Sequence, residues 1–502
     1  MTGALRRLFS SPTRPSLRKA LPFVAAGLIA ASGQAPLSLW WLGLAGFALV
    51  FYFFTRAASP GAAAWLGWCF GAGYFAGALF WIVEPFLVDV ARHGWMAPFA
   101  LVFLSGGLAL IWATAFGLAA RFSPGLRGLG LIVLWSAAEM LRAVLFTGFP
   151  WALAGYIWTD HPIVQLAALG GPHLLTFATF AIAGLPFILR PVPGGVAALG
   201  VLAAGWVYGM AALSDAPPAQ TGKTVRLIQP NAAQNLKWKR DMVPVFLQRQ
   251  LDLTASPAET APDLVIWPET AIAYRLSLAE PVLREISAAA KGVPVILGAN
   301  DVIDEAFHNT LAVLDEGGAV QSAYHKHHLV PFGEYIPFGD FLRQFGINGL
   351  AARDGAGYAS GPGPRLINIP GIGSALPLIC YEVIFPRNFR TETRPDLMIQ
   401  ITNDAWFGNL SGPYQHLAQA RVRAVEQGLP LIRAANTGVS AVIGPQGRVL
   451  AATALNEAAV LDAPVPAALP ATPYARFGDW PMRALLLVLL VLALTVRRGL
   501  RD

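Results

Sequence analysis

The sequence predicts an α-helical membrane bundle of about eight transmembrane helices, joined to an α/β domain outside the membrane. Only 13% of the 502 residues are charged, about half of the share that is usual in soluble domains. Residues 222–470 differ from the rest, because short apolar runs alternate there with polar helical segments, as in α/β domains. We therefore predict a seven-span bundle (1–214), a domain (215–475), and a last helix with its tail (476–502).

Four stretches lack Asp, Glu, Lys and Arg altogether: 20–55, 57–83, 96–120 and 191–214. A span needs about 20 apolar residues, so the first stretch can hold two spans, with a break near residues 32–36. The predicted spans are 18–33, 36–55, 62–83, 96–120, 128–147, 163–189, 194–214 and 480–497. The last of them requires the Arg483 side chain to reach the membrane surface, because its charge-free part covers only 484–496.

The basic residues next to these spans predict the orientation of the chain. With eight spans they fall on one side of the membrane: Arg6, Arg7, Arg14, Arg18, Lys19, Arg56, Arg121, Arg127, Arg190, Arg497, Arg498 and Arg501. By the positive-inside rule that side is the cytoplasm, and Glu84 and Asp89 lie opposite. The net charge of +7 thus indicates topology rather than nucleic-acid binding, and the domain is predicted outside.

Two features of the bundle allow a second interpretation. Arg6 and Arg7 before an apolar run could belong to a twin-arginine or ordinary signal peptide, but an uncleaved anchor is simpler because a second span follows at once. Glu139 and Arg142 lie three residues apart within the fifth predicted span. An intramembrane ionisable pair is a candidate functional site, and the alternative that we favour is a pair that neutralises itself near the outer end.

The domain is predicted to alternate strands with helices. The expected strands are Val225–Ile228, Asp263–Trp267, Val293–Leu297, Leu376–Ile379, Leu397–Ile401 and Leu429–Arg433. The expected helices are 241–255, 281–291 and 414–427. Several strands are continuous apolar runs, which are typical of a sheet covered on both faces.

Cys380 is the only one of the two cysteines outside the predicted spans, since Cys69 lies in the third. A lone thiol in an exported, oxidising compartment is a candidate reactive group. It directly follows the apolar run Leu376–Ile379, so the end of a buried strand would present its side chain, and the next N–H groups could face a developing oxyanion. A buried, inert cysteine is the alternative at this point.

Two carboxylates and a lysine accompany this cysteine. Glu269 ends the apolar run that begins at Val265, where a helix cap or loop anchor is the structural alternative. Lys326 lies in a segment rich in aromatic and apolar residues, and Glu334 follows in the turn Pro-Phe-Gly-Glu. Lysines are few in the domain, so Lys326 is a candidate for stabilising negative charge.

Three features together resemble the nitrilase superfamily: a glutamate after a strand (Glu269), a lysine before a Pro-Phe-Gly-Glu turn (Lys326) and a cysteine at a strand end (Cys380). With the predicted spans, the whole chain resembles the apolipoprotein N-acyltransferase family of bacteria. Further runs that match are Gly148–Trp151, Gln229–Asn231, Lys237–Trp238, Thr402–Phe407 and Gly478–Trp480. Each run alone is weak, and their order and spacing carry the resemblance. The chain shows no departure at the three catalytic positions.

The resemblance implies a nitrilase-like αββα sandwich for the domain. It also implies that Glu269 is the general base, Lys326 the oxyanion-stabilising lysine and Cys380 the nucleophile, with Glu334 as a second, supporting glutamate. Three further positions match residues linked to substrate binding or to mobile loops: Trp238, Tyr381 and Glu382. Trp238 could instead simply pack, and Glu382 could be a solvated residue of the turn.

The implied reaction moves an acyl chain from a glycerophospholipid, through a thioester on Cys380, to the N-terminal α-amine of a diacylglyceryl-cysteine apolipoprotein. It needs no metal or other cofactor. A free thiol with a pKa near 8.5 is mostly protonated at neutral pH, so a base beside it is required. The implied location is the bacterial inner membrane, with the catalytic domain on the periplasmic side.

Three other functions fit parts of the sequence. A membrane-anchored amidase or nitrilase would use the same residues, although it needs no eight-span anchor. A transporter would need more buried charge in its spans than Glu139 and Arg142 supply. A zinc site could draw on residues of suitable type near Lys326, namely His325, His327, His328 and Glu334. The chain has no G-x-S-x-G serine motif.

Overall fold

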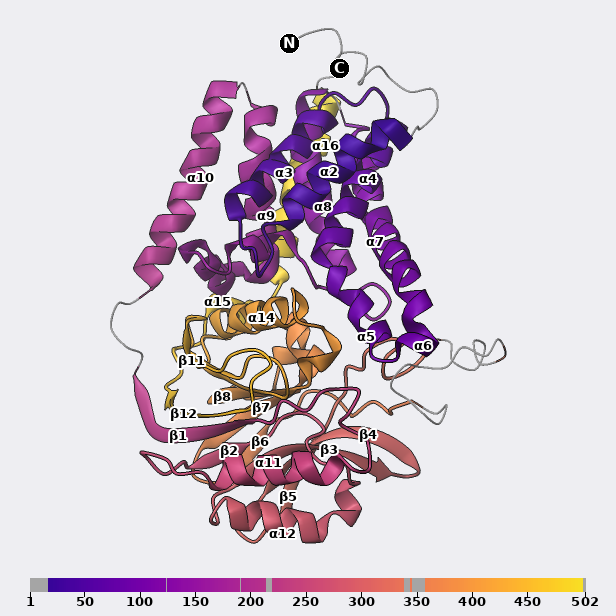
Figure 1. Cartoon of the computed structure of the whole chain (residues 1–502). Helices are drawn as coiled ribbons and strands as arrows, with labels where there is room; N and C mark the ends of the chain where they lie inside the picture. Colours follow the sequence, from indigo (N-terminus) through magenta and orange to yellow (C-terminus); the bar gives the residue numbers. More distant parts are fainter. Residues whose placement is uncertain are drawn as a thin grey trace. The chain divides into compact units, whose positions relative to one another are not determined.

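The computed structural model describes residues 17–122, 124–189, 191–213, 219–337, 344 and 357–499 (Figure 1). It divides into two compact units, Met1–Ser214 with Thr472–Asp502, and Asp215–Ala471. Helix α15 (Pro473–Phe477) belongs to the helical unit in this division, and the predicted domain boundary at 475 stays a prediction. Several basic residues that predict the topology lie outside the described residues: Arg6, Arg7, Arg14, Arg190 and Arg501. For four others the structure describes the helix but not the side chain: Arg18, Lys19, Arg497 and Arg498.

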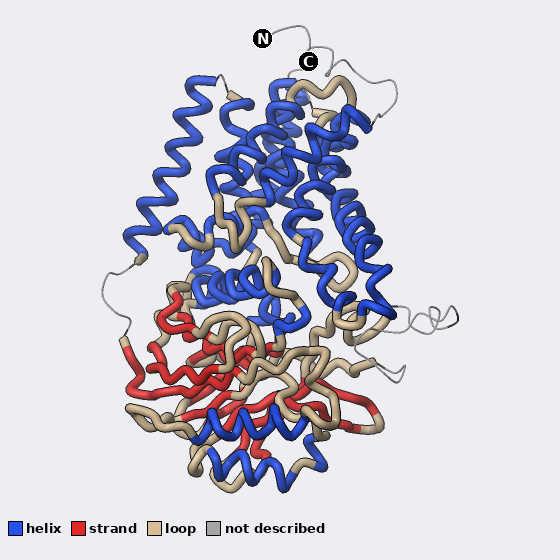
Figure 2. Tube along the Cα trace, viewed as in Figure 1, coloured by secondary structure: helices blue, strands red, loops and turns tan. Residues whose placement is uncertain are grey.

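The helical unit consists of helices and short 3₁₀ turns, drawn in blue and tan in Figure 2. Its other helices are α2 (Leu17–Ala31), α3 (Trp40–Phe54), α4 (Pro60–Ala78), α5 (Glu84–Leu87), α6 (Val90–His93), α7 (Ala97–Ala119), α8 (Arg127–Arg142), α9 (Ala167–Ile188), α10 (Pro191–Ala212) and α16 (Trp480–Gly499). A helix therefore overlaps each of the eight predicted spans.

Three helical stretches are long and apolar enough to cross a membrane, among the residues described: Val90–Ala119, Pro162–Ile188 and Pro191–Ala212. A fourth candidate is the pair Pro60–Ala78 and Phe80–Leu87, which is bent by 68°. Shorter apolar helices occupy three more predicted spans. Apolar membrane helices are thus present, and the count of eight spans stays a prediction.

Small residues set the closest helix contacts of this unit. A Cβ atom added at Gly27 of α2 would lie 2.1 Å from the Phe70 carbonyl oxygen of α4, and one at Gly73 of α4 would lie 2.2 Å from the Val24 carbonyl oxygen. Glycine on both helices therefore lets their backbones touch, as in many membrane bundles. Helix α9 is broken at Gly171, whose φ of 67° is unfavourable for residues with a side chain.

The intramembrane pair predicted from sequence is fully buried and bidentate. Arg142 Nε lies 2.8 Å from Glu139 Oε1, and Arg142 Nη2 lies 2.7 Å from Glu139 Oε2. Trp112 Nε1 donates to the same carboxylate at 2.8 Å. Arg142 Nη1 also donates to the carbonyl oxygens of Phe149 (2.5 Å) and Trp151 (2.8 Å), so the pair ties the chain beyond α8 back onto this helix.

The Asp215–Ala471 unit contains two six-stranded sheets. The first has the order β12-β1-β2-β3-β4-β5, and the second the order β11-β10-β9-β8-β7-β6. Parallel pairs lie at the centre of each sheet and antiparallel pairs at its edges. The strands of the first sheet are β1 (Gln220–Gln229), β2 (Leu264–Ile266), β3 (Val295–Ile303), β4 (Ala306–Leu314), β5 (Val320–His325) and β12 (Ala459–Pro466). Those of the second are β6 (Ile367–Ile369), β7 (Gly373–Ile379), β8 (Leu397–Thr402), β9 (Leu431–Ala435), β10 (Ala441–Ile443) and β11 (Val449–Ala452).

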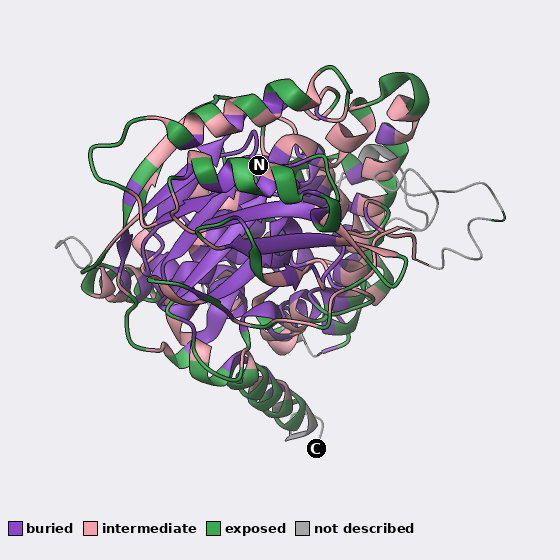
Figure 3. Cartoon of the chain, turned by 90° about the horizontal axis from the view of Figure 1, so that it is seen from below, coloured by how far each residue is buried: buried purple, intermediate pink, exposed green. Residues whose placement is uncertain are grey.

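Helices cover the outer face of both sheets, which gives four layers, α, β, β and α (Figures 1 and 2). Helices α11 (Val243–Ala255) and α12 (Glu280–Ala289) lie on the first sheet, and α14 (Gly412–Gln427) lies on the second. Figure 3 shows the strands between them mostly in the colour of buried residues. The predicted αββα sandwich is therefore confirmed, and every strand and helix predicted in this domain is present.

Candidate active site

The candidate residues sit where strands of the two sheets end. Glu269 follows β2, and Lys326 directly follows β5, so both come from the first sheet. Cys380 directly follows β7 of the second sheet and begins a short 3₁₀ segment, Cys380–Ile384. Because the two sheets pack face to face, residues far apart in the sequence meet between them. All three side chains are buried, with exposures between 1% and 6%.

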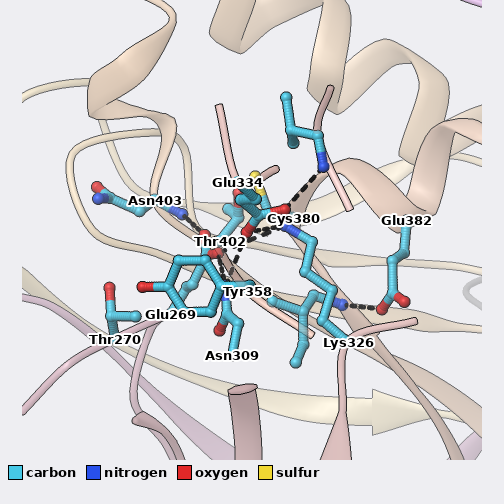
Figure 4. Close-up of polar contacts among 12 residues, drawn as sticks. Glu269, Thr270, Asn309, Lys326, Glu334, Tyr358, Cys380, Glu382, Thr402 and Asn403 are labelled. Carbon is cyan, nitrogen blue, oxygen red and sulfur yellow. Dashed lines mark hydrogen bonds and ion pairs between the residues drawn. The ribbon is translucent and has the colours of Figure 1, made fainter. Parts of the chain in front are cut away.

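The Lys326 ammonium lies between two carboxylates. Its Nζ is 2.8 Å from Glu334 Oε1 and 3.8 Å from Glu269 Oε1. Asn309, on β4, donates from Nδ2 to both carboxylates, at 2.7 Å to Glu269 and 3.2 Å to Glu334. Figure 4 shows these side chains converging with Cys380. Asn309 thus holds together two like charges that would otherwise repel each other.

Glu269 is also oriented from the second sheet. The main-chain N–H of Asn403, just after β8, donates to Glu269 Oε2 at 2.8 Å. Glu334 is anchored in the same manner, because its Oε2 accepts from the Val330 N–H at 2.8 Å. Each carboxylate therefore has one oxygen fixed by the backbone and the other directed at the Lys326 and Asn309 donors.

The charges of this cluster set the resting state of the thiol. Burial alone would lower the pKa of Lys326, but the carboxylates of Glu334 and Glu269 raise it above its ordinary value, so the lysine stays a cation. Burial raises the pKa of the Cys380 thiol, Glu269 raises it further, and Lys326 opposes both. Cys380 therefore rests as a neutral thiol, and its activation needs a base at the moment of attack.

Cys380 has an unusual backbone conformation, with φ at +51°. A left-handed conformation costs a residue with a side chain about 1–3 kcal/mol. The Cys380 carbonyl oxygen accepts two hydrogen bonds, from Gln400 Nε2 and His416 Nε2, each 3.1 Å long. Such bonds contribute about 0.5–1.5 kcal/mol each, so together they can offset the strain of this conformation.

Glu382 is fully buried and lies apart from the charged cluster (Figure 4). Its carboxylate accepts from three main-chain N–H groups, those of Ile379 (2.8 Å), His327 (2.9 Å) and His328 (3.2 Å). The Tyr324 hydroxyl donates to it at 3.0 Å. Glu382 therefore ties the strand end before Cys380 to the segment after Lys326, and the alternative of a solvated residue is wrong.

Tyr381 and Trp238 lie in different surroundings. The buried Tyr381 ring packs edge-on against Phe385, with centroids 4.9 Å apart. Trp238 lines a pocket with Lys237, Pro268 and Thr270, and none of Glu269, Lys326 and Cys380 lines that pocket. The cluster of buried charges, rather than this pocket, therefore marks the candidate site, and a substrate-binding role for Trp238 stays a prediction.

Lys237 is a buried cation that sequence reasoning did not single out. Its Nζ donates to the Glu269 carbonyl oxygen (3.2 Å) and to Thr270 Oγ1 (3.0 Å), and it lies 5.5 Å from the Trp238 ring centroid. Burial lowers the pKa of Lys237 to about 8, and Glu269 opposes this shift. Its only sequence signal was its place in the Lys-Trp run.

We expect Lys237 to make stability depend on pH above neutrality. The unfolded chain keeps the proton on this group up to about pH 10.5, whereas the folded chain releases it near pH 8. Stability should therefore rise between these values, by roughly 3 kcal/mol at most. The difference in melting temperature between the parent and Lys237→Met, measured from pH 7 to 10.5, should shift in favour of the parent. An unchanged difference would contradict the assignment.

Among the described residues, the side chains proposed for a zinc site do not come together. No three His, Cys, Asp or Glu side chains gather there as metal ligands. His325 Nδ1 lies 2.9 Å from Thr310 Oγ1, whereas His327 Nδ1 lies 2.7 Å from a Glu382 oxygen. The two histidines therefore face different partners.

Two family models match the chain. Residues 26–185 match the apolipoprotein N-acyltransferase N-terminal domain, and residues 224–474 match the carbon-nitrogen hydrolases. The apolipoprotein N-acyltransferase of Caulobacter vibrioides is 37% identical over 97% of this chain and 96% of its own length. That of Rhodopseudomonas palustris is also 37% identical, over 96% of each chain.

Solved structures of lower identity also match. A CN-hydrolase superfamily protein of Xanthomonas campestris has a TM-score of 0.36 and 19% identity, and it covers 48% of this chain and 90% of its own. An amidase of a Nesterenkonia species has a TM-score of 0.35 and 20% identity, over 50% and 94% of the two chains. The near full-length relatives carry the conclusion: this chain belongs to the apolipoprotein N-acyltransferase family, a group of acyltransferases within the nitrilase superfamily.

Proposed function

We propose that this chain transfers an acyl chain from a glycerophospholipid to the N-terminal α-amine of a diacylglyceryl-cysteine apolipoprotein, through a thioester on Cys380. The observation that supports this most is the buried cluster in which Lys326 lies 3.8 Å from Glu269 and 2.8 Å from Glu334, electrostatically coupled to the Cys380 thiol. A neutral thiol, a fixed cation and an adjacent carboxylate are the groups that covalent acyl transfer requires.

In the first half-reaction, Cys380 Sγ attacks the ester carbonyl carbon of the phospholipid while Glu269 takes the thiol proton. Lys326 and the Tyr381 N–H stabilise the negative charge that develops on the carbonyl oxygen. Loss of one such donor typically costs about 10²–10³ in rate. The tetrahedral intermediate then expels the lysophospholipid alkoxide, which takes the proton from Glu269, and Cys380 is left as a thioester.

In the second half-reaction, the α-amine of the acceptor attacks the thioester carbonyl and Glu269 takes a proton from the nitrogen. The same two donors stabilise the oxyanion. Collapse of the intermediate breaks the C–S bond, and the departing thiolate recovers the proton. The products are an amide on the lipoprotein and the free Cys380 thiol. Glu334 positions Lys326, while Tyr381, Glu382 and Trp238 support the site or the binding of substrate.

We further propose the bacterial inner membrane as the location, with eight spans and residues 215–475 on the periplasmic side. The apolar helices of the helical unit support a membrane location. Residues 1–214 form the bundle in this arrangement, and 476–502 return the chain to the cytoplasm. Both lipid substrates could then reach Cys380 laterally from the bilayer.

A transfer assay with the purified full chain tests this function. A glycerophospholipid with a labelled acyl chain and a diacylglyceryl-cysteine peptide should yield labelled peptide whose new bond resists hydroxylamine, because an amide resists it and a thioester does not. The membrane-anchored amidase predicts the opposite: no labelled peptide, but hydrolysis of simple soluble amides. A peptide with an acetylated N-terminus is the matched control and should stay unlabelled.

A further inference from the structure

Two buried side chains hold the main-chain carbonyl of the proposed nucleophile. Gln400, on β8, and His416, on α14, each place Nε2 3.1 Å from the Cys380 carbonyl oxygen. Both side chains are fully buried. The acyl-transfer steps proposed above use neither of them, although they lie directly behind Cys380.

A charged pair behind these residues fixes the Gln400 amide. Arg433 Nη1 donates to Gln400 Oε1 at 2.6 Å, and the Arg433 guanidinium also pairs with Asp404. Arginine can only donate, so the Gln400 oxygen must face Arg433 and the Gln400 nitrogen must face Cys380. His416 Nδ1 lies 3.2 Å from Arg433 Nη2 and accepts from it, which leaves the ring proton on Nε2, facing the Cys380 carbonyl; Asp404 Oδ1 lies 2.9 Å from the same Nδ1. All four side chains are fully buried.

The contact with the carbonyl determines where the next N–H points. The Cys380 C=O and the Tyr381 N–H belong to one planar peptide unit, and in a trans peptide they point in opposite directions. With the carbonyl directed at Gln400 and His416, the Tyr381 N–H faces away from α14. Cys380 itself has a φ of +51°, a backbone conformation that a residue with a side chain rarely adopts unaided.

We propose that Gln400 and His416 are positioning residues that hold the Cys380–Tyr381 peptide with its N–H directed at the oxyanion. Asp404 and Arg433 keep the two donors in place. The proposal rests on the proposed function, because it assigns a purpose to the Tyr381 N–H only if Cys380 is acylated. In this role the four residues act through the peptide.

Two reactions of the Cys380 sulfur distinguish a loss of peptide positioning from a general loss of stability. Acylation of Cys380 by phospholipid passes through an oxyanion, whereas alkylation by iodoacetamide displaces iodide and forms none. Gln400→Met keeps the length of the side chain without its donor. It should slow acylation about 10- to 100-fold, less than the full loss of an oxyanion donor, and leave alkylation within about threefold. Gln419→Met, at a buried glutamine of α14 whose Nε2 donates to the Gln415 carbonyl, is the matched control and should change neither rate.

A second pair of variants keeps the test decisive if Gln400→Met is unstable. His416→Gln places an amide N–H near the position of Nε2 and should retain acylation within about threefold of the parent, whereas His416→Leu should lose it as Gln400→Met does. The proposal is overturned if the donor-less variants acylate at the parent rate, or if acylation and alkylation fall together. Absence of acylation in the parent would instead overturn the proposed function.

Discussion

Replacing Cys380 by alanine should abolish acyl transfer, with a fall in rate of at least about 10⁴-fold, because no other group in the cluster can carry the acyl chain. The fold should survive. The site of substitution is buried, alanine lacks only the sulfur, and the contacts of the Cys380 carbonyl with Gln400 and His416 are made by the main chain. The measurement is transfer of a labelled acyl chain from phospholipid to a diacylglyceryl peptide, alongside the melting temperature.

The chain offers a matched control for this variant in its second cysteine. Cys69 is fully buried in α4 of the helical unit, so Cys69→Ala makes the same chemical change away from the candidate site. It should leave the rate of transfer within about twofold, since it removes no group that the mechanism uses. Normal turnover by the Cys380→Ala variant would rule out covalent catalysis by this residue.

The largest effect on stability is expected at Glu382. In Glu382→Ala the N–H groups of Ile379, His327 and His328 lose their acceptor in the interior. Removing one partner of a buried charged network costs about 3–5 kcal/mol, which corresponds to a fall of roughly 6–20 °C in melting temperature for a unit of this size. Glu285→Ala, at an exposed glutamate of α12, should change it by less than about 2 °C.

The pH dependence of stability shows how much of the contribution of Glu382 comes from its charge. Burial by itself would lower the pKa of His327, but its hydrogen bond and charge interaction with Glu382 raise the pKa above the ordinary 6.5. A raised pKa stabilises the fold below pH 6.5, and this contribution is lost as the pH rises through the higher folded value. Glu382→Gln should abolish that dependence. A melting temperature that is unchanged in Glu382→Ala would show that the three N–H groups find other partners.

The sequence predicted the central strands of the domain well. Runs such as Leu397–Ile401 are apolar throughout, and β8 is indeed buried along its length. The β4–β5 hairpin was not predicted, because polar residues such as Asn309 and Ser322 interrupt its apolar pattern. The residue that breaks the pattern in β4 is also the one that joins Glu269 to Glu334.

The sequence predicted the charged residues of the candidate site but not the residues that orient them. Glu269 and Cys380 end apolar runs that are visible in the sequence, whereas Lys326 was singled out by its aromatic and apolar neighbours, because the strand before it, β5, was not predicted. Gln400 lies within a buried strand, where a polar residue gives no hint of its partner until the fold brings Cys380 beside it. Glu382 is a different case. Its place in a turn was compatible with a solvated side chain, but its carboxylate is buried and accepts from main-chain N–H groups of the nearby Ile379 and of His327 and His328, which lie far from it in the sequence.

We expect Cys380 to become a thioester before any acceptor is present. Intact-mass measurement of the purified chain after incubation with phospholipid alone tests this most directly. We expect a mass increase of one acyl group, absent in Cys380→Ala and in protein whose thiols were blocked beforehand, and removed by hydroxylamine. Formation of lysophospholipid with no adduct on the protein, or an adduct that persists in Cys380→Ala, would contradict the account.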